Sequence, residues 1–349
     1  MNKTLILETM LNSPGHIQQK LINSLVENGV GTYSPKKCPN LIQFTNKIIK
    51  EKISESIKLQ NITFKIIDLI EISKGYRYSV IYKCESIDMN QLKENCLDIN
   101  SNYYDDFDEM STMFLEDNEH IYIKFHRKIN LLKKENGLYW NEIRYPLLFV
   151  FHKNLKLLEA RFDRLQIEED KTLYRTYLKT SLDYLEKTLN VKWSHVNMDE
   201  IIRKAVELYN GNVIVELIWS GELTKSRGIT LKAGKDMVMP FWGELPIEIN
   251  RLREKYSDKP DALDCLGDIE NYLNEERKYA NERIRGFRLI KALKNEQYIK
   301  LERPIELTVT FNHGESMIDL INIYDSEFND MERMDYVIKL IAETKKYIK

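Results

Sequence analysis

Residues 120–164 read HIYIKFHRKINLLKKENGLYWNEIRYPLLFVFHKNLKLLEARFDR, and this stretch decides the fold. Its apolar and polar side chains alternate, which predicts strands near residues 120–132, 138–151 and 155–164. The turn-forming sequences Glu135-Asn136-Gly137 and Lys153-Asn154 separate these strands. Strands so close along the chain pair as hairpins, so the sequence predicts an antiparallel meander.

The first strand of this meander has two different faces. Apolar side chains alternate with aromatic and cationic ones: Ile121, Ile123 and Phe125 with Tyr122, Lys124, His126 and Lys128. Because successive side chains of a strand point to opposite faces, we expect the apolar set to pack on the core and the other set to face solvent.

The charge of the chain changes sign just before the meander. Residues 98–119 contain eight acidic side chains and no basic one, whereas residues 120–164 contain ten basic and four acidic side chains. A basic sheet surface favours an anionic partner such as a nucleic acid. We expect the acidic segment to compete for that surface as an internal decoy.

Length and composition predict two α+β domains. The chain has 349 residues, of which 43% are hydrophobic, and single cores rarely grow beyond roughly 250–300 residues. The charged run at residues 168–171 places the boundary, so that domain one spans 1–168 and domain two 169–349. We expect each domain to pair an antiparallel sheet with flanking helices.

Periodicity and capping residues predict the remaining elements. Helices are expected from Pro14 to about residue 28, from Pro39 to about 57, over 173–189, after the N-cap Asn197, over 260–294, and at the C-terminus. Strands are expected near 62–70, 76–84, 212–219, 228–232, 236–241, 298–311 and 316–324.

The long helix over 260–294 has acids at its front and bases at its back. Its Arg283, Arg285 and Arg288 are expected to face a phosphate backbone. With the basic face of the meander, the predicted nucleic-acid-binding residues are Lys124, His126, Lys128, Lys153, Lys156, Arg283, Arg285 and Arg288.

These features predict a non-enzymatic subunit that binds DNA or RNA or forms a protein complex. No catalytic motif, metal-ligand set or cofactor fingerprint is recognised. One alternative is a metal-dependent phosphodiesterase that uses His126 with a carboxylate group at Asp105, Asp106, Asp108 and Glu109. Another is a protein–protein adaptor with an apolar interface at Trp219, Phe241 and Trp242.

The cysteines and the lengths of the apolar runs indicate in which cellular compartment the protein is expected. Cys38, Cys84, Cys96 and Cys265 are scattered without metal-ligand spacing, which predicts reduced thiols in a cytoplasmic protein. No apolar run reaches the roughly 18–20 residues that a membrane span needs, so no membrane partner is expected.

Overall fold

The computed structural model describes residues 3–101, 110–133, 139–163, 173–224, 227–234, 245–278, 283–294, 297–311, 318–324 and 331–348. Their helices and strands confirm the predicted α+β class. Two compact units are present: an N-terminal unit, Met1–Val196 with Phe328–Glu332, and a C-terminal unit, Asn197–Glu327 with Arg333–Lys349. The predicted domain boundary at residues 168–169 lies outside the described residues and stays a prediction.

The N-terminal unit is built on the meander. The strands β6 (His120–Lys133), β7 (Tyr139–His152) and β8 (Leu157–Phe162) pair in antiparallel order, as predicted. The sheet continues from β8 to β3 (Tyr78–Cys84) and β9 (Trp193–His195), and from β6 to β5 (Met113–Glu116) and β4 (Leu97–Asp98). A separate parallel pair joins β1 (Gly31–Thr32) to β2 (Ile42–Gln43).

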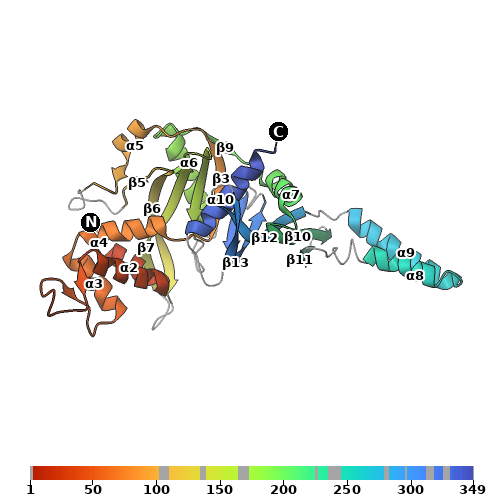
Figure 1. Cartoon of the computed structure of the whole chain (residues 1–349), viewed down its shortest axis with the longest axis horizontal. Coiled ribbons are helices and arrows are strands. Elements are labelled where there is room, and N and C mark those ends of the chain that lie inside the picture. The colour runs from red at the N-terminus through yellow and green to blue at the C-terminus, as the bar shows by residue number, and fades with distance from the viewer. Residues whose placement is uncertain are drawn as a thin grey trace. The chain divides into compact units, whose positions relative to one another are not determined.

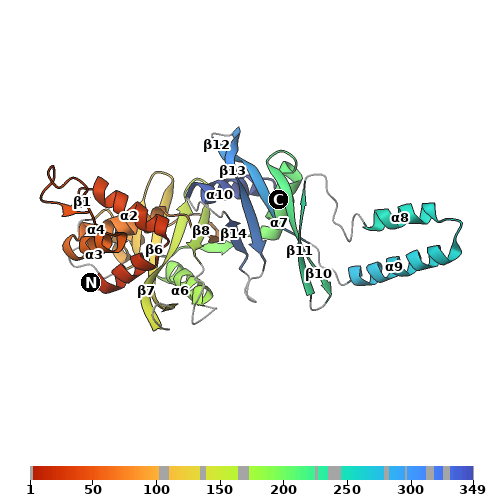
Figure 2. The ribbon, with the colours of Figure 1, turned by 90° about the horizontal axis from the view of Figure 1, so that it is seen from below.

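Helices cover both faces of this sheet. The helices α1 (Lys3–Asn12), α2 (Gly15–Glu27), α3 (Ile49–Leu59) and α4 (Ile62–Ser73) form one group beside β6 and β7 (Figure 2). On the opposite face lies α6 (Leu173–Lys187), whose Tyr184 and Tyr177 rings contact Phe125 and Tyr145 at centroid distances of 5.5 and 6.0 Å. A short helix, α5 (Met89–Asn95), follows β3. The meander therefore has no face that is left wholly to solvent.

The strand predicted near 62–70 is wrong, because this segment is the helix α4. The prediction followed the isoleucine and threonine content of the segment, which is typical of strands. In the folded protein the side chains of this segment are buried on nearly every side of the helix, and this tertiary packing overrides the strand propensity. The helix predicted from Pro39 begins only at Ile49, since residues 42–43 belong to β2.

The strands of the C-terminal unit pair in antiparallel fashion in the order β11-β10-β12-β13-β14. These strands are β10 (Ile214–Thr224), β11 (Arg227–Gly234), β12 (Arg283–Lys294), β13 (Gln297–Thr310) and β14 (Leu320–Tyr324). The helices of this unit are α7 (Met198–Tyr209), α8 (Leu245–Lys255), α9 (Pro260–Lys278) and most of α10 (Met331–Lys345). The predicted N-cap is confirmed, because Asn197 Oδ1 accepts a hydrogen bond from the backbone N–H of Glu200 at 3.3 Å.

The helix predicted over 260–294 is half wrong. The described helix ends at Lys278, and residues 283–294 form β12 (Figure 1). Phe287 and Leu289 lie opposite Leu307 and Ile305 of β13 and are buried, while Arg288 between them is exposed. This alternation has the period of a strand. The order of acids before bases suggested one long helix, but it runs across two different elements, α9 and β12.

No helix among the described residues combines the length and the apolarity that crossing a membrane would require.

Candidate functional site

Five charged or ionisable side chains of the N-terminal unit meet in its interior. We call them the buried ion cluster: Asp68 and Glu71 of α4, Lys124 and His126 of β6, and Arg144 of β7. Their exposed fractions run from 0% for Asp68 and Lys124 to 8% for His126. The cluster lies where α4 packs on the face of the meander that was expected to meet solvent.

Local geometry brings the two carboxylates to one point. Asp68 and Glu71 are three residues apart on α4, a spacing that places both on one face of a helix. Lys124 Nζ lies 2.6 Å from Asp68 Oδ1 and 2.8 Å from Glu71 Oε2. Arg144 Nη2 lies 3.0 and 2.8 Å from the same two oxygens. Two anions and two cations therefore balance within the protein interior, where an unpaired charge would be strongly unfavourable.

The cluster sets the protonation of its members. Burial by itself raises the pKa of Glu71, but the charges of Arg144 and Lys124 outweigh it and hold this pKa well below its usual value. Burial, followed by the charges of Arg144 and Lys124, lowers the pKa of His126 to about 4. His126 Nδ1 lies 3.1 Å from the carbonyl oxygen of Ser111, which can only accept, so this nitrogen carries the proton of the neutral ring.

Three acceptor atoms of the cluster have no hydrogen-bond partner in the part of the chain that the structure describes: Asp68 Oδ2, Glu71 Oε1 and His126 Nε2. His126 Nε2 lies 3.7 Å from Glu71 Oε2, which is beyond hydrogen-bonding distance. A buried acceptor without a donor costs roughly 1–3 kcal/mol. These atoms mark the place where a donor from outside the cluster would stabilise the protein.

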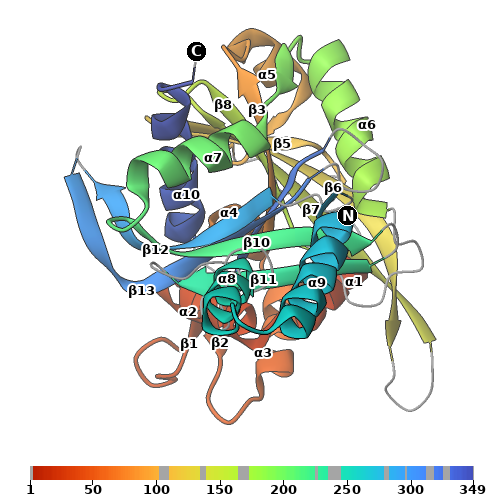
Figure 3. The same ribbon diagram turned by 90° about the vertical axis from the view of Figure 1, so that its right-hand side faces the viewer.

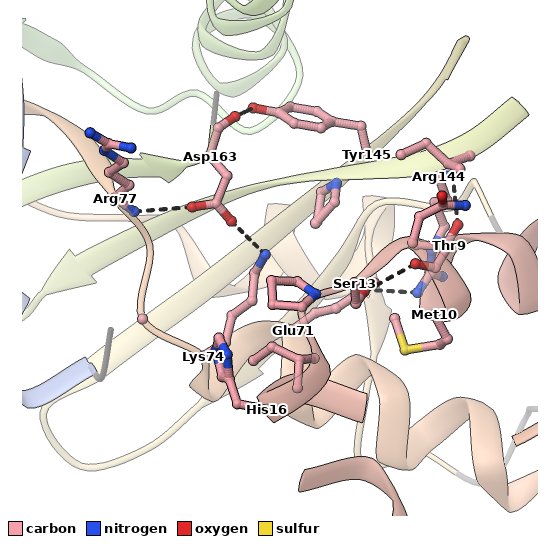
Figure 4. Close-up of a pocket in the computed structure, with 16 residues that line it drawn as sticks. Thr9, Met10, Ser13, His16, Glu71, Lys74, Arg77, Arg144, Tyr145 and Asp163 are labelled. Carbon is pink, nitrogen blue, oxygen red and sulfur yellow. Dashed lines mark hydrogen bonds and ion pairs between the residues drawn. The ribbon is translucent and has the colours of Figure 1, made fainter. Parts of the chain in front are cut away.

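A cavity of about 480 Å³ reaches this cluster at Glu71 and Arg144 (Figure 4). Its walls come from the end of α1, the start of α2, the end of α4, and β7. The lining residues are Thr9, Met10, Asn12, Ser13, Pro14, His16, Ile17, Glu71, Lys74, Gly75, Arg77, Ile143, Arg144, Tyr145, Pro146 and Asp163. A volume of this size is ordinary for a small-molecule site.

Hydrogen bonds hold the walls of the cavity in place. Thr9 Oγ1 accepts from the backbone N–H of Arg144 at 2.8 Å and donates to the carbonyl oxygen of Leu5, which ties α1 to β7. On the other side, Asp163 accepts from Lys74 Nζ at 2.7 Å and from the backbone N–H of Arg77 at 3.1 Å (Figure 4). The cavity is thus framed by α1, β7 and the loop after α4.

A second buried charge group lies on the same face of the meander. Glu159 Oε2 accepts from His152 Nε2 at 3.1 Å and from Arg161 Nε at 2.8 Å, and all three side chains are buried. None of them lines the cavity. We read this group as an internal counterpart of the buried ion cluster that neutralises one more basic residue of the meander.

The predicted nucleic-acid-binding residues are not brought together. Lys124 and His126 are buried, so the expectation that they face solvent is wrong for both. Among the meander's other predicted contacts, Lys128 and Lys156 are exposed, and Lys153 Nζ lies 2.7 Å from Glu116 Oε1. The physical reason is that α4 supplies carboxylates to the face that alternation alone would leave to water.

The three predicted arginines lie on β12 instead of a helix. Arg285 is half-buried and lies at a bulge in the pairing of β12 with β10, whereas Arg288 is exposed. Arg285 Nη2 lies 3.4 Å from Thr310 Oγ1, and Arg288 Nη1 lies 3.4 Å from Glu216 Oε2. The side chain of Arg283 lies outside the described residues, so the structure does not support one arginine-lined surface.

Apart from His126, the residues of the two alternative hypotheses lie outside the described part of the chain. This holds for Asp105, Asp106, Asp108 and Glu109, for Phe241 and Trp242, and for the side chain of Trp219. Sequence reasoning also missed Asp68, Glu71 and Arg144 as site residues. The available signal was two acids in the mostly apolar segment ITFKIIDLIEIS, residues 62–73.

Asp68, Glu71 and His126 also have the composition of a metal site, with their ligand atoms within 4.8 Å of one another. Lys124 and Arg144 already neutralise both carboxylates at 2.6–3.0 Å. A divalent cation would be repelled by both of these cations and would add a double positive charge to a cluster that is already neutral, so the residues do not fit a metal.

We therefore expect thermal unfolding to be the same with saturating Mg²⁺, with Mn²⁺ and with EDTA. A metal present at 100 times its Kd would add about 2.7 kcal/mol and raise Tm by several degrees. Differential scanning calorimetry checks this, and a rise of that size with either metal would contradict the charge argument.

No protein-family model matches the chain, and no curated protein matches it either.

Proposed function

We propose that the protein is a non-catalytic binding subunit whose N-terminal unit holds a small amphiphilic molecule in the cavity beside the buried ion cluster. The observation that supports this most directly is Glu71 Oε1. This atom belongs to a carboxylate that is only 3% exposed, has no hydrogen-bond partner among the described residues, and lies on a residue that lines the cavity. A ligand that donates a hydrogen bond there would satisfy it.

The rest of the cavity specifies the other parts of the ligand. Met10, Ile17 and Ile143 supply apolar walls, against which a hydrocarbon body would pack. Lys74 and Arg77 line the other end of the cavity, where Asp163 accepts from Lys74 Nζ and from the backbone N–H of Arg77. Cationic side chains at this end favour an anionic group on the ligand. The ligand would thus carry an ammonium or other donor at one end and an anion at the other.

Binding is favoured over catalysis by the protonation states of the cluster. General acid–base groups work best when their pKa is near the working pH. Burial holds the pKa of His126 near 4, and paired cations hold the pKa of Glu71 low. Both groups keep one protonation state near neutral pH, which suits a site that holds a ligand and leaves it unchanged.

Three related probes test the ligand class by isothermal titration calorimetry: L-phenylalanine, 3-phenylpropanoate and 2-phenylethylamine. We expect the zwitterion to bind best. Loss of the ammonium leaves Glu71 Oε1 without a hydrogen-bond donor, and loss of the carboxylate removes the contact with the end of the cavity at Lys74 and Arg77. Each analogue should therefore bind about tenfold weaker or worse.

Variants show whether this binding occurs in the cavity. Arg77→Glu and Ser13→Trp should weaken it, the first by charge and the second by filling space. Lys93→Glu makes the same charge change at an exposed site on α5 outside the cavity and should leave affinity unchanged. If the wild type binds none of the probes, or if all three variants bind alike, the proposal is wrong.

Nucleic-acid binding stays a prediction of the sequence. Pairing has removed Lys124 from the surface of the meander, together with Arg144 and Arg161, which were counted in its basic charge. Lys128 and Lys156 are the predicted meander contacts that the structure describes as exposed. Two exposed lysines supply little of the phosphate neutralisation on which such binding depends.

A further inference from the structure

The C-terminal unit contains a pair of helices that hardly bury each other. Helices α8 and α9 lie side by side, joined through residues 256–259 (Figures 2 and 3). Among their described side chains, Ile249 and Leu266 are the buried apolar ones. Helices of this length are marginally stable alone in water, and most of their stability comes from packing an apolar face. The pair therefore has apolar surface to cover and little internal packing to stabilise it.

Helix α9 carries two apolar stripes with heptad spacing. One contains the buried Leu266, and next to it Glu270 forms an ion pair with Arg253 of α8, so this stripe faces α8. The second, which we call the exposed seam, contains Ala262, Cys265, Ile269 and Tyr272. Its steps of three, four and three residues are those of a coiled-coil a/d seam.

The exposed seam lies open in the part of the chain that the structure describes. Ile269 is 42% exposed and Tyr272 65%, and Ile247 on α8 is 62% exposed. Large apolar side chains that gather at regular helical spacing mark an interaction surface, whereas single exposed ones do not. The seam has the form that a partner helix would pack against.

Charge decides which kind of helix fits. The seam is flanked by Asp261, Asp264 and Asp268, all of which are exposed. With Ala262 and Ile269 at a positions, Asp261 and Asp268 fall at g positions, which contact the partner helix in a coiled coil. A second copy of α9 in antiparallel orientation would place acid against acid. A helix with basic flanking residues would instead form ion pairs and be selected.

We infer that the exposed seam of α9 binds an amphipathic helix of another protein, whose apolar seam is flanked by lysine or arginine. This surface belongs to the C-terminal unit and is independent of the cavity. The inference assigns the complex-forming role that the sequence predicts to the exposed seam, and it states the chemistry of the partner helix.

Two synthetic helical peptides test the inference with the full-length chain. They share one leucine seam at a and d, and their flanking positions are all lysine in one and all glutamate in the other. By fluorescence anisotropy, we expect the lysine peptide to bind about tenfold more tightly than the glutamate peptide, because both g-position aspartates attract lysine and repel glutamate. The preference should shrink as salt is raised.

Matched variants locate the binding. Ile269→Glu should abolish it, whereas Asn274→Glu, which adds the same charge on another side of α9, should leave it within about twofold because exposed sites away from an interface change little. Asp261→Lys with Asp268→Lys should reverse the preference toward the glutamate peptide. Circular dichroism confirms that each variant keeps its helices.

Three results would overturn the inference. Equal binding of both peptides would remove the role of the aspartates, and full binding by Ile269→Glu would place the peptide elsewhere. The third is a dimer of the wild-type chain, seen by light scattering, that Ile269→Glu dissociates, since a second copy would then occupy the seam.

Discussion

Replacing Lys124 by methionine is expected to lower the free energy of unfolding of the N-terminal unit by about 3–5 kcal/mol, the range measured when one partner of a buried ion pair is removed. The variant leaves Asp68 and Glu71 with Arg144 as their remaining cation in the cluster, at a site where Lys124 and Asp68 are both 0% exposed. Methionine fills much the same space, so the loss comes from charge and not from a cavity.

Amide hydrogen exchange measures this effect locally. The chain has two compact units, so a single spectroscopic transition could mix them. Peptides from α4 should exchange much faster in Lys124→Met, while peptides from α10 residues 333–345 should not change. Lys128→Met is the matched control, because Lys128 is four residues further along β6 and exposed, and it should change stability by no more than about 0.5 kcal/mol.

A second substitution separates charge from packing. Glu71→Gln in the Lys124→Met background leaves Asp68 against Arg144 and restores local neutrality. The double variant is therefore expected to be more stable than Lys124→Met alone, with a coupling energy of about 1–3 kcal/mol. Additive losses would mean that the two side chains act independently, contrary to the cluster geometry.

The second large effect expected is a loss of stability in mild acid. The pKa of His126 is lowered from about 6.5 to about 4 in the folded protein, first by burial and then by Arg144 and Lys124. The unfolded chain binds a proton on this ring below about pH 6.5 and the folded one does not, so unfolding becomes easier as the pH falls. Between pH 6.5 and 4 the loss from this one residue should approach 3 kcal/mol.

Other groups around His126 act in the same direction but in a lower pH range. Its neighbours are Glu71 and Asp68 on α4, Lys124 on β6 and Arg144 on β7. The lowered pKa of Glu71 stabilises the fold above the pKa of the unfolded carboxyl, and this stability is lost as the pH falls below about 4.5. The interval between pH 6.5 and 4.5 is thus where the histidine can be seen separately.

His126→Asn tests the assignment. Asparagine can donate to the Ser111 carbonyl oxygen as the ring does, but it does not titrate. Urea unfolding followed from pH 7 to pH 4.5 should show a steep decline for the wild type and a shallower one for the variant. His152, which pairs with Glu159, is present in both proteins and cancels in the difference. Identical pH profiles would mean that His126 does not govern this decline.

Some elements could be predicted because their signals are local. The turn-forming sequence Glu135-Asn136-Gly137 and the alternation on either side predicted β6 and β7, and Asn197 predicted the start of α7. The predictions failed where a local signal was ambiguous. Isoleucine-rich α4 resembled a strand, and the arginines of β12 resembled the end of a helix. A helix over residues 3–12 was not predicted at all.

The candidate site could be predicted only in part. The sequence indicated Lys124 and His126 as site residues, but it predicted that they would contact an external anion. Their partners Asp68 and Glu71 lie 56 and 53 residues away from Lys124 along the chain. No spacing rule connects residues at such a distance, so the acids that neutralise the meander could not be assigned from their positions.

The sequence by itself determined that β6 alternates between an apolar and a cationic face, because the period of a strand is a property of the backbone. Only the tertiary structure decided that the cationic face would be covered. Once α4 packs there, Lys124 and Arg144 are removed from water, and a charge without water is stable only beside an opposite charge. The same basic residues that predicted an outside partner thus bind the protein's own acids, and the cavity beside them is where an outside molecule can reach the cluster.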